Sequence, residues 1–100
     1  MFTVQVTTEF QDWLDALTDK RTQIRIVARL RQAETGNLGD WGAIQGPLSE
    51  MRVHFGPGYR LYFTRRGRVL LVVLCGGTKS TQARDIKRAL RLLEELDIDS

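Results

Sequence analysis

Hydrophobic and polar positions alternate most clearly between residues 48 and 66, where the period of the pattern is two. The apolar positions of this stretch are Met51, Val53, Phe55, Leu61 and Phe63. Successive side chains of a strand point to opposite faces, so the pattern predicts a β-hairpin with one face in the core. In the intervening Gly56-Pro57-Gly58-Tyr59, Pro57 and Gly58 suit the second and third positions of a type II turn.

The opposite face of the predicted hairpin is polar. Its residues are Glu50, Arg52, His54, Arg60, Tyr62 and Thr64. Arginine binds phosphate oxygens through planar paired donors, and histidine is the side chain that ordinarily titrates nearest neutral pH. This face therefore carries the residue types that bind a phosphate and move a proton.

A short strand and a helix are predicted at the N-terminus. Residues 2–6 alternate in polarity, and Thr7 or Thr8 then suits a helix N-cap, because its hydroxyl accepts from an early backbone N–H. The apolar positions that follow at helical spacing are Phe10, Trp13, Leu14 and Leu17. We expect Trp13 to belong to the core.

A second helix is expected from Lys20 to Glu34, ended by Gly36, which suits the left-handed position after a helix. The residues expected to face the core are Ile24, Val27 and Ala28, flanked by Ile26 and Leu30. Residues 37–42 are interpreted as a loop. Trp41 in this loop is either a cap on the core or an exposed contact.

The C-terminal third predicts a strand and a helix. Residues 68–75 are apolar through their centre, which is typical of a strand covered on both faces. Residues 76–80 then lead into a helix over 81–96. The order β-α-α-β-β-β-α predicts an α+β fold, with an antiparallel sheet packed by an N-terminal helical hairpin and a C-terminal helix. We expect one domain over residues 1–100.

Composition and charge limit the class of protein and the kinds of partner that we expect. The chain is 42% hydrophobic and 27% charged, with a net charge of +3. The last seven residues hold four acids and no Lys or Arg, so the rest of the chain is more basic and suits a polyanion. The single Cys75 fits a reducing cytoplasm, and one Cys with one His argues against a metal site built on these ligands. No signal peptide or membrane span is expected.

The order of elements and motifs resembles the RelE/ParE toxin superfamily, and more closely its HigB-like branch of addiction-module killer proteins. The segments that carry the resemblance are Trp13-Leu14, Arg25-Ile26-Val27-Ala28-Arg29-Leu30, Gly36-Asn37-Leu38-Gly39-Asp40, Leu48-Ser49-Glu50-Met51-Arg52, Gly56-Pro57-Gly58-Tyr59-Arg60-Leu61-Tyr62 and Gly76-Gly77-Thr78-Lys79-Ser80-Thr81-Gln82. Each segment is weakly specific by itself, and the ordered set covers nearly the whole chain.

The resemblance implies a RelE-like fold and a toxin of a bacterial type II toxin–antitoxin pair. RelE-like members are endoribonucleases that usually cut mRNA on the ribosome, without a cofactor. The implied partners are mRNA, the ribosome and an antitoxin, often a helix-turn-helix protein, through which DNA is bound. One alternative is a ParE-like inhibitor of DNA gyrase, and another is an inactive member that only binds its antitoxin.

RNA cleavage without a metal needs a base, cations at the phosphate and an acid. The candidates for these roles are Arg52, Arg60, Tyr62, Lys79, Glu50 and His54. Arg52, Arg60 and Tyr62 match the basic residues and tyrosine that RelE-like nucleases place on this sheet face. Glu50 or His54 is the base, although Glu50 also suits a purely orienting role toward Arg52, and His54 suits an inert surface position.

Two further basic features are candidates for RNA contact. Lys79 follows two glycines and precedes a helix, where backbone N–H groups favour an anion. A helical stripe with four-residue spacing, together with Lys20, is expected to contact ribosomal RNA. The alternatives are a contact with the antitoxin and a helix face that is simply exposed to solvent. The residues of this stripe are Lys20, Arg21, Arg25 and Arg29.

Overall fold

The computed structural model describes residues 1–99, and the side chains of residues 1–96. Its elements, in chain order, are β1 (Thr3–Val6), α1 (Thr8–Ala16), α2 (Lys20–Glu34), β2 (Trp41–Gln45), β3 (Leu48–Val53), β4 (Tyr59–Arg66), β5 (Leu70–Thr78), the 3-10 turn η1 (Lys79–Thr81) and α3 (Gln82–Asp99). The expected bounds of α2 and the hairpin of β3 and β4 are confirmed, and α3 is longer than expected. In residues 1–99 no helix is both long and apolar enough to cross a membrane.

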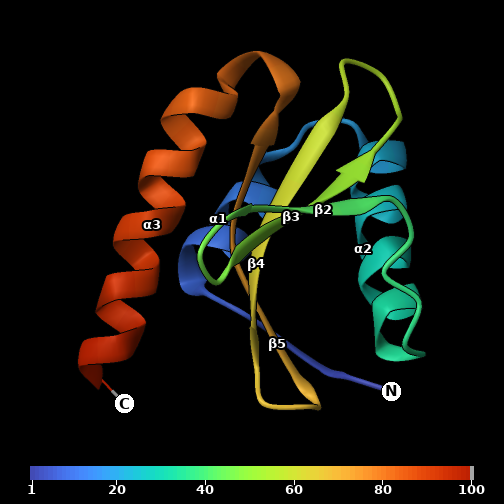
Figure 1. Cartoon of the computed structure of the whole chain (residues 1–100). Coiled ribbons are helices and arrows are strands. Elements are labelled where there is room, and N and C mark those ends of the chain that lie inside the picture. The colour runs from blue at the N-terminus through green and yellow to red at the C-terminus, as the bar shows by residue number, and fades with distance from the viewer. Residues whose placement is uncertain (100) are drawn as a thin grey trace.

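The five strands form one mixed sheet in the order β1-β5-β4-β3-β2 (Figure 1). The expectation of a purely antiparallel sheet is wrong, because β1 pairs with β5 in parallel. The α1–α2 segment carries the chain from β1 across one face before the remaining strands pair antiparallel. Residues 41–42 were expected in a loop, but they begin β2, which pairs with β3 from Trp41 opposite Met51.

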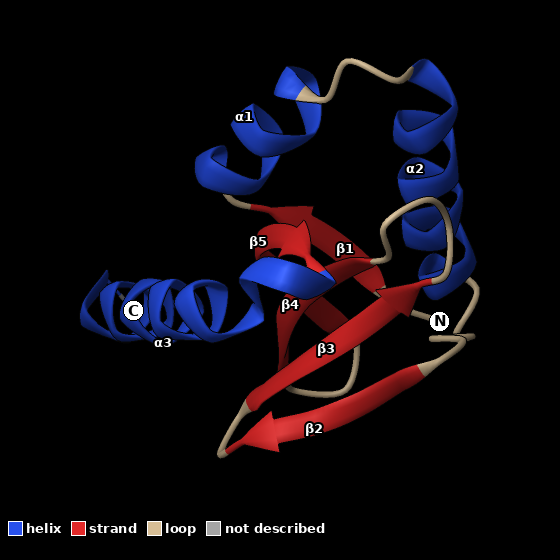
Figure 2. Ribbon diagram, turned by 90° about the horizontal axis from the view of Figure 1, so that it is seen from above, coloured by secondary structure: helices blue, strands red, loops and turns tan. Residues whose placement is uncertain are grey.

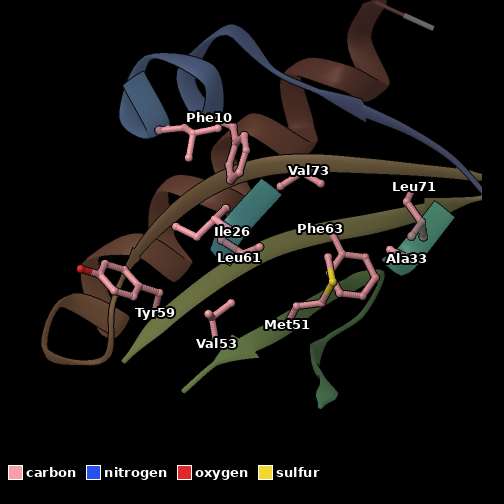
Figure 3. Close-up of a cluster of buried hydrophobic side chains, with 11 residues drawn as sticks. Phe10, Ile26, Ala33, Met51, Val53, Tyr59, Leu61, Phe63, Leu71 and Val73 are labelled. Carbon is pink, nitrogen blue, oxygen red and sulfur yellow. The ribbon is translucent and has the colours of Figure 1, made fainter. Parts of the chain in front are cut away.

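Helices cover both faces of the sheet. Figure 1 shows α3 on one side and α2 on the other, and Figure 2 shows α1 on the same side as α2. The core between the sheet and the first two helices includes Phe10, Leu14, Ile26, Ala33, Met51, Val53, Leu61, Phe63, Leu71 and Val73 (Figure 3). A second core lies under α3 and includes Leu48, Tyr62, Leu74, Ala89, Leu92 and Leu93.

The apolar face expected for the hairpin is confirmed, and Trp13 packs against the same core. The opposite face is not the open polar surface that alternation suggested. Glu50 and Tyr62 are 5% and 0% exposed, and Thr64 is 1% exposed. The reason is α3, which packs across this face of β3, β4 and β5.

The inward face of α2 differs from the expected one. Its buried residues are Thr22, Ile26 and Ala33, whereas Ile24 is 67% exposed. This rotation turns Arg29 toward the sheet, because positions 22, 26, 29 and 33 share one helix face. The guanidinium of Arg29 donates to backbone carbonyls there, which allows a cation on the buried side.

Two local expectations have clear outcomes. Thr7 is the N-cap of α1, because its hydroxyl accepts from the Phe10 N–H at 3.0 Å. The tight turn of the hairpin lies one residue earlier than expected, since the Gly58 N–H donates to the Phe55 carbonyl at 3.0 Å. Gly56 and Gly58 both have positive φ angles, which glycine adopts without strain.

Candidate functional site

Strand register places the two candidate arginines side by side. Arg52 of β3 lies directly opposite Arg60 of β4, and Arg60 lies opposite Gly77 of β5. Two residues further along the same face of the hairpin, Glu50 lies opposite Tyr62. The hairpin therefore brings together four of the six catalytic candidates at the end of the sheet where α3 begins.

Glu50 holds the two arginines together. Its Oε2 atom lies 3.0 Å from Arg52 Nε, and its Oε1 atom lies 3.6 Å from Arg60 Nε. Gln82, the first residue of α3, donates to the same Oε1 at 3.2 Å. Two like charges on directly opposed strand positions repel each other, so a shared carboxylate between them stabilises the pair. Glu50 is thus an orienting counter-ion whose two oxygens are occupied, and we do not assign it as the base.

Arg52 is fixed from its outer side by Asp40. The carboxylate of Asp40 accepts from Arg52 Nη1 at 2.8 Å through Oδ1. Hydrogen bonding to Asp40 accordingly raises the pKa of Arg52 above its ordinary value. Gly42 makes room for this geometry, since a Cβ atom there would lie 2.6 Å from Arg52 Nη2.

Asp40 also holds His54. The second carboxylate oxygen of Asp40, Oδ2, pairs with His54 Nε2, and the imidazole side chain is 70% exposed. Hydrogen bonds from His54 and Arg52 hold the pKa of the Asp40 carboxyl below its usual range. One carboxylate therefore places an accessible imidazole beside an arginine. Sequence reasoning missed Asp40, because its position opposite Arg52 depends on β2.

Lowering the pH is expected to remove the stabilising contribution of Asp40. Because its pKa is lowered in the folded state, the contribution is complete above the unfolded value, about 4, and is lost as the pH falls through the folded value. Asp40→Asn is therefore expected to unfold at lower urea than the wild type at pH 7 and to approach it at low pH. A difference in midpoint that does not change with pH contradicts this role.

Arg29 positions the segment that carries Asp40. Its Nη1 donates to the Arg52 carbonyl at 2.7 Å, and its Nη2 donates to the Leu38 and Asp40 carbonyls at 2.7 and 3.2 Å. Burial lowers the pKa of this guanidinium from its ordinary value. These bonds give Arg29 a structural role, so we remove it from the expected RNA-binding stripe.

Arg29→Lys is expected to lower the free energy of unfolding by about 1–3 kcal/mol, since hydrogen bonds from a charged donor are lost. An ammonium keeps the charge but lacks the planar fork that reaches three carbonyls. Urea unfolding measures the difference. Arg31→Lys, on an exposed position of the same helix, is the matched control and is expected to change little. Equal stability of the two variants contradicts the role of Arg29.

Tyr62, one of the six catalytic candidates, is not accessible to a substrate in this structure. It is 0% exposed under α3, and its hydroxyl is buried without a hydrogen-bond partner. Burial raises the pKa of Tyr62 above its ordinary value, which keeps the phenol neutral. Burial likewise raises the pKa of the Cys75 thiol to about 12, so the thiol has no thiolate character at neutral pH.

Lys79 begins η1 beside the hairpin turn, and its side chain is exposed. The expected backbone anion site is wrong at two of its N–H groups. The Lys79 N–H donates to the Gly58 carbonyl at 3.0 Å, and the Thr78 N–H donates to Thr81 Oγ1 at 3.2 Å. Lys79 therefore offers its side-chain charge at the rim rather than a cradle of free N–H groups.

The remaining stripe residues lie on the outer side of α2. Arg21 is 82% exposed and lies 3.6 Å from Asp19. Arg25 is exposed, and its guanidinium lies over the Phe55 ring at 4.7 Å from the centroid. Lys20 is exposed at the start of the helix. Among the described residues, no group of three or more His, Cys, Asp or Glu side chains is placed to hold a metal ion.

Solved structures of other proteins share the fold of this chain. No protein-family model matches the chain. The structure is similar to that of YafQ from E. coli strain BL21(DE3), with a TM-score of 0.61 and 14% identity over 82% of this chain and 98% of that chain. It is also similar to the conserved hypothetical protein HP0894 from Helicobacter pylori, with a TM-score of 0.52 and 19% identity over 80% of this chain and 97% of that one.

Sequence comparison finds a relative with higher identity than these solved structures. An uncharacterized protein of Haemophilus influenzae is 39% identical over 95 residues, which span 95% of this chain and 96% of that protein. At this identity and coverage, the two chains share ancestry and not the fold alone. This α+β protein, with its five-stranded mixed sheet and three helices, therefore belongs to the same family as the Haemophilus influenzae protein.

Proposed function

We propose that this chain is the toxin of a type II toxin–antitoxin pair and that it acts as a ribosome-dependent mRNA endoribonuclease. The observation that carries the proposal is the single carboxylate of Asp40, which joins an accessible imidazole to one of two adjacent arginines. Its fold, shared with YafQ, a toxin of the RelE family, supports the toxin class. The site of action is the cytoplasm, where ribosomes and mRNA are found.

The proposed reaction needs no metal. Arg52 and Arg60 bind the oxygens of the scissile phosphate and stabilise the charge that develops on it. The 2′-oxygen attacks the phosphorus, the bond from phosphorus to the 5′-oxygen breaks, and the proton lost by the 2′-hydroxyl is balanced by one gained by the leaving 5′-oxygen. His54 takes part in this proton transfer through Nδ1, because Nε2 faces Asp40. Lys79 adds a cation at the rim of the site. The products are a 2′,3′-cyclic phosphate and a free 5′-hydroxyl.

Basic residues outside this site extend the surface available to RNA. Lys20, Arg21 and Arg25 lie on α2, and contacts with ribosomal RNA phosphates would release counterions. Neutralisation requires an antitoxin, for which we propose a helix-turn-helix protein, as in the HigB-like branch that the sequence motifs resemble. DNA binding would then belong to the toxin–antitoxin complex.

The test is induction of the chain in a bacterium that lacks its antitoxin, followed by mapping of mRNA 5′ ends. The expected result is growth arrest with new cuts inside translated frames, and loss of these cuts in His54→Gln. His54 is the better variant than Arg60, because the Arg60 side chain is 12% exposed and its removal would leave Glu50 buried with one fewer cation.

Two results would overturn the proposal. Growth arrest with intact mRNA and altered plasmid supercoiling would indicate a gyrase inhibitor of the ParE type. No arrest, with an intact and folded chain, would indicate a family member that only binds its antitoxin. Lys87→Gln, on an exposed position of α3, is the control variant and is expected to cut as the wild type does.

A further inference from the structure

A hollow lies beside His54, outside the arginine pair. It has a volume of about 220 Å³ and opens between α2 and residues 53–55. Arg25, Arg29 and Gln32 of α2 line one side, and His54 and Phe55 line the other. Ala28 and Val53 add apolar surface to the lining. A concave site that combines apolar surface with a few polar groups is a common form of a small-molecule site.

Arg25 and Phe55 form a flat platform at this hollow. The guanidinium of Arg25 lies 4.7 Å from the centroid of the half-buried Phe55 ring. A guanidinium held against an aromatic ring keeps its outer face for another planar group. Unpaired nucleobases stack on aromatic rings and on arginine planes in this way.

Polar groups line the same hollow as the platform. The side-chain amide of Gln32 has both a donor and an acceptor, as the edge of a nucleobase does. Arg29 also lines the hollow, and its Nη atoms already donate to backbone carbonyls. His54 lies at the rim and turns its Nε2 toward Asp40, so the hollow adjoins the proposed proton-transfer group.

We propose that this hollow, the nucleobase pocket, binds one unpaired base of single-stranded RNA next to the scissile phosphate. The base stacks on the platform of Arg25 and Phe55 and meets Gln32 at its edge. This inference rests on the proposed function for the identity of the RNA, and it assigns Arg25 to base stacking rather than to a phosphate contact. It also makes the pocket the part of the chain that sets sequence preference at the cut.

The first test measures binding by the full-length wild-type chain. Adenosine 5′-monophosphate and ribose 5-phosphate are titrated separately, and the NMR resonances of Phe55 and Gln32 are followed. We expect the nucleotide to shift these resonances and to bind more tightly than the sugar phosphate, which carries the same phosphate without a base. Equal binding of the two probes would show an anion site only and would overturn the pocket.

The variant for this test is Arg25→Gln, which removes the platform at an exposed position. We expect its nucleotide affinity to fall by about 5- to 100-fold, the loss typical for one stacked base. Arg84→Gln removes an equally charged side chain that is 70% exposed on α3, and its nucleotide affinity is expected to be unchanged. Equal affinities of Arg25→Gln and the wild type would overturn the pocket.

The second test compares the bases around mapped RNA cuts made by the wild type and by Arg25→Gln. Continued cutting with a changed base preference supports the pocket. Continued cutting with an unchanged preference overturns it and leaves the proposed function standing. If the wild type cuts no RNA but prefers the nucleotide over the sugar phosphate, the pocket stands and the proposed function fails.

Discussion

Replacement of His54 by glutamine is expected to lower the rate of RNA cleavage by about 100- to 10,000-fold, the usual contribution of a positioned proton-transfer group. Glutamine fills similar space and its amide can still donate to Asp40, but it cannot exchange a proton at neutral pH. The side chain is 70% exposed, so its replacement removes little buried surface. A loss of activity with unchanged stability would therefore report chemistry rather than folding.

The measurement is single-turnover cleavage of mRNA bound to ribosomes by the purified chain, paired with urea unfolding of the same samples. Lys87→Gln serves as a control for charge loss on the surface. A His54→Gln rate within about twofold of the wild-type rate would remove histidine from the mechanism, because proton transfer contributes at least 100-fold where it operates. The arginine pair would then remain as a binding site without an assigned acid or base.

Substitution of Gly77 by alanine is expected to lower the free energy of unfolding by about 3 kcal/mol, the upper end of the usual cost of overpacking. A Cβ atom at this position would lie 1.8 Å from Asp85 Oδ2 and 2.6 Å from its Cγ. Asp85 is 1% exposed and accepts a hydrogen bond from Thr81, so it cannot swing into solvent without losing that bond and its packing. The clash therefore separates the start of α3 from β5.

A double-mutant cycle with Asp85→Ala makes this prediction specific. If the clash is the cause, the stability lost in Gly77→Ala/Asp85→Ala is smaller than the sum of the two single losses, by at least about 0.5 kcal/mol. Urea unfolding of all four proteins gives the coupling. Ser80→Ala, on an exposed nearby position, is the control. If the two losses are additive, the destabilisation by Gly77→Ala does not come from a clash with Asp85.

Gly77 also matters for the candidate site, since it lies opposite Arg60 in the sheet register. The α3 residue that reaches Glu50 is Gln82, five positions after Gly77. A displaced helix start would therefore release one of the bonds that fix the carboxylate between the two arginines. We expect Gly77→Ala to weaken cleavage together with stability, unlike His54→Gln.

Much of the candidate site could be predicted from sequence because it lies on one hairpin. The direct pairing of Arg52 with Arg60 was not predicted, because the tight turn lies one residue earlier than expected. The period of two, however, fixes which residues share a face. These relations are local, so they need no knowledge of the rest of the chain. The expected capping role of Thr7 and the bounds of α2 are local for the same reason.

The missed features all depend on contacts between distant segments. The strand β2 is only five residues long and contains Gly42, so its pairing with β3 is what identifies it. Without β2, Asp40 has no place opposite Arg52. The rotation of α2 was also mispredicted, because Ile24 is a better core residue than Arg29 by polarity, yet Arg29 finds backbone carbonyls to bind.

Local periodicity and the order of elements were enough to assign the two faces of the hairpin, the shared face of Arg52 and Arg60, and the α+β class. Which polar residues are accessible depends instead on contacts between distant segments. The packing of α3 buries Tyr62 and Glu50, whereas the loop before β2 joins Asp40 to the exposed His54. Burial is a property of what lies above a face, and the alternation along a strand carries no information about its covering layer.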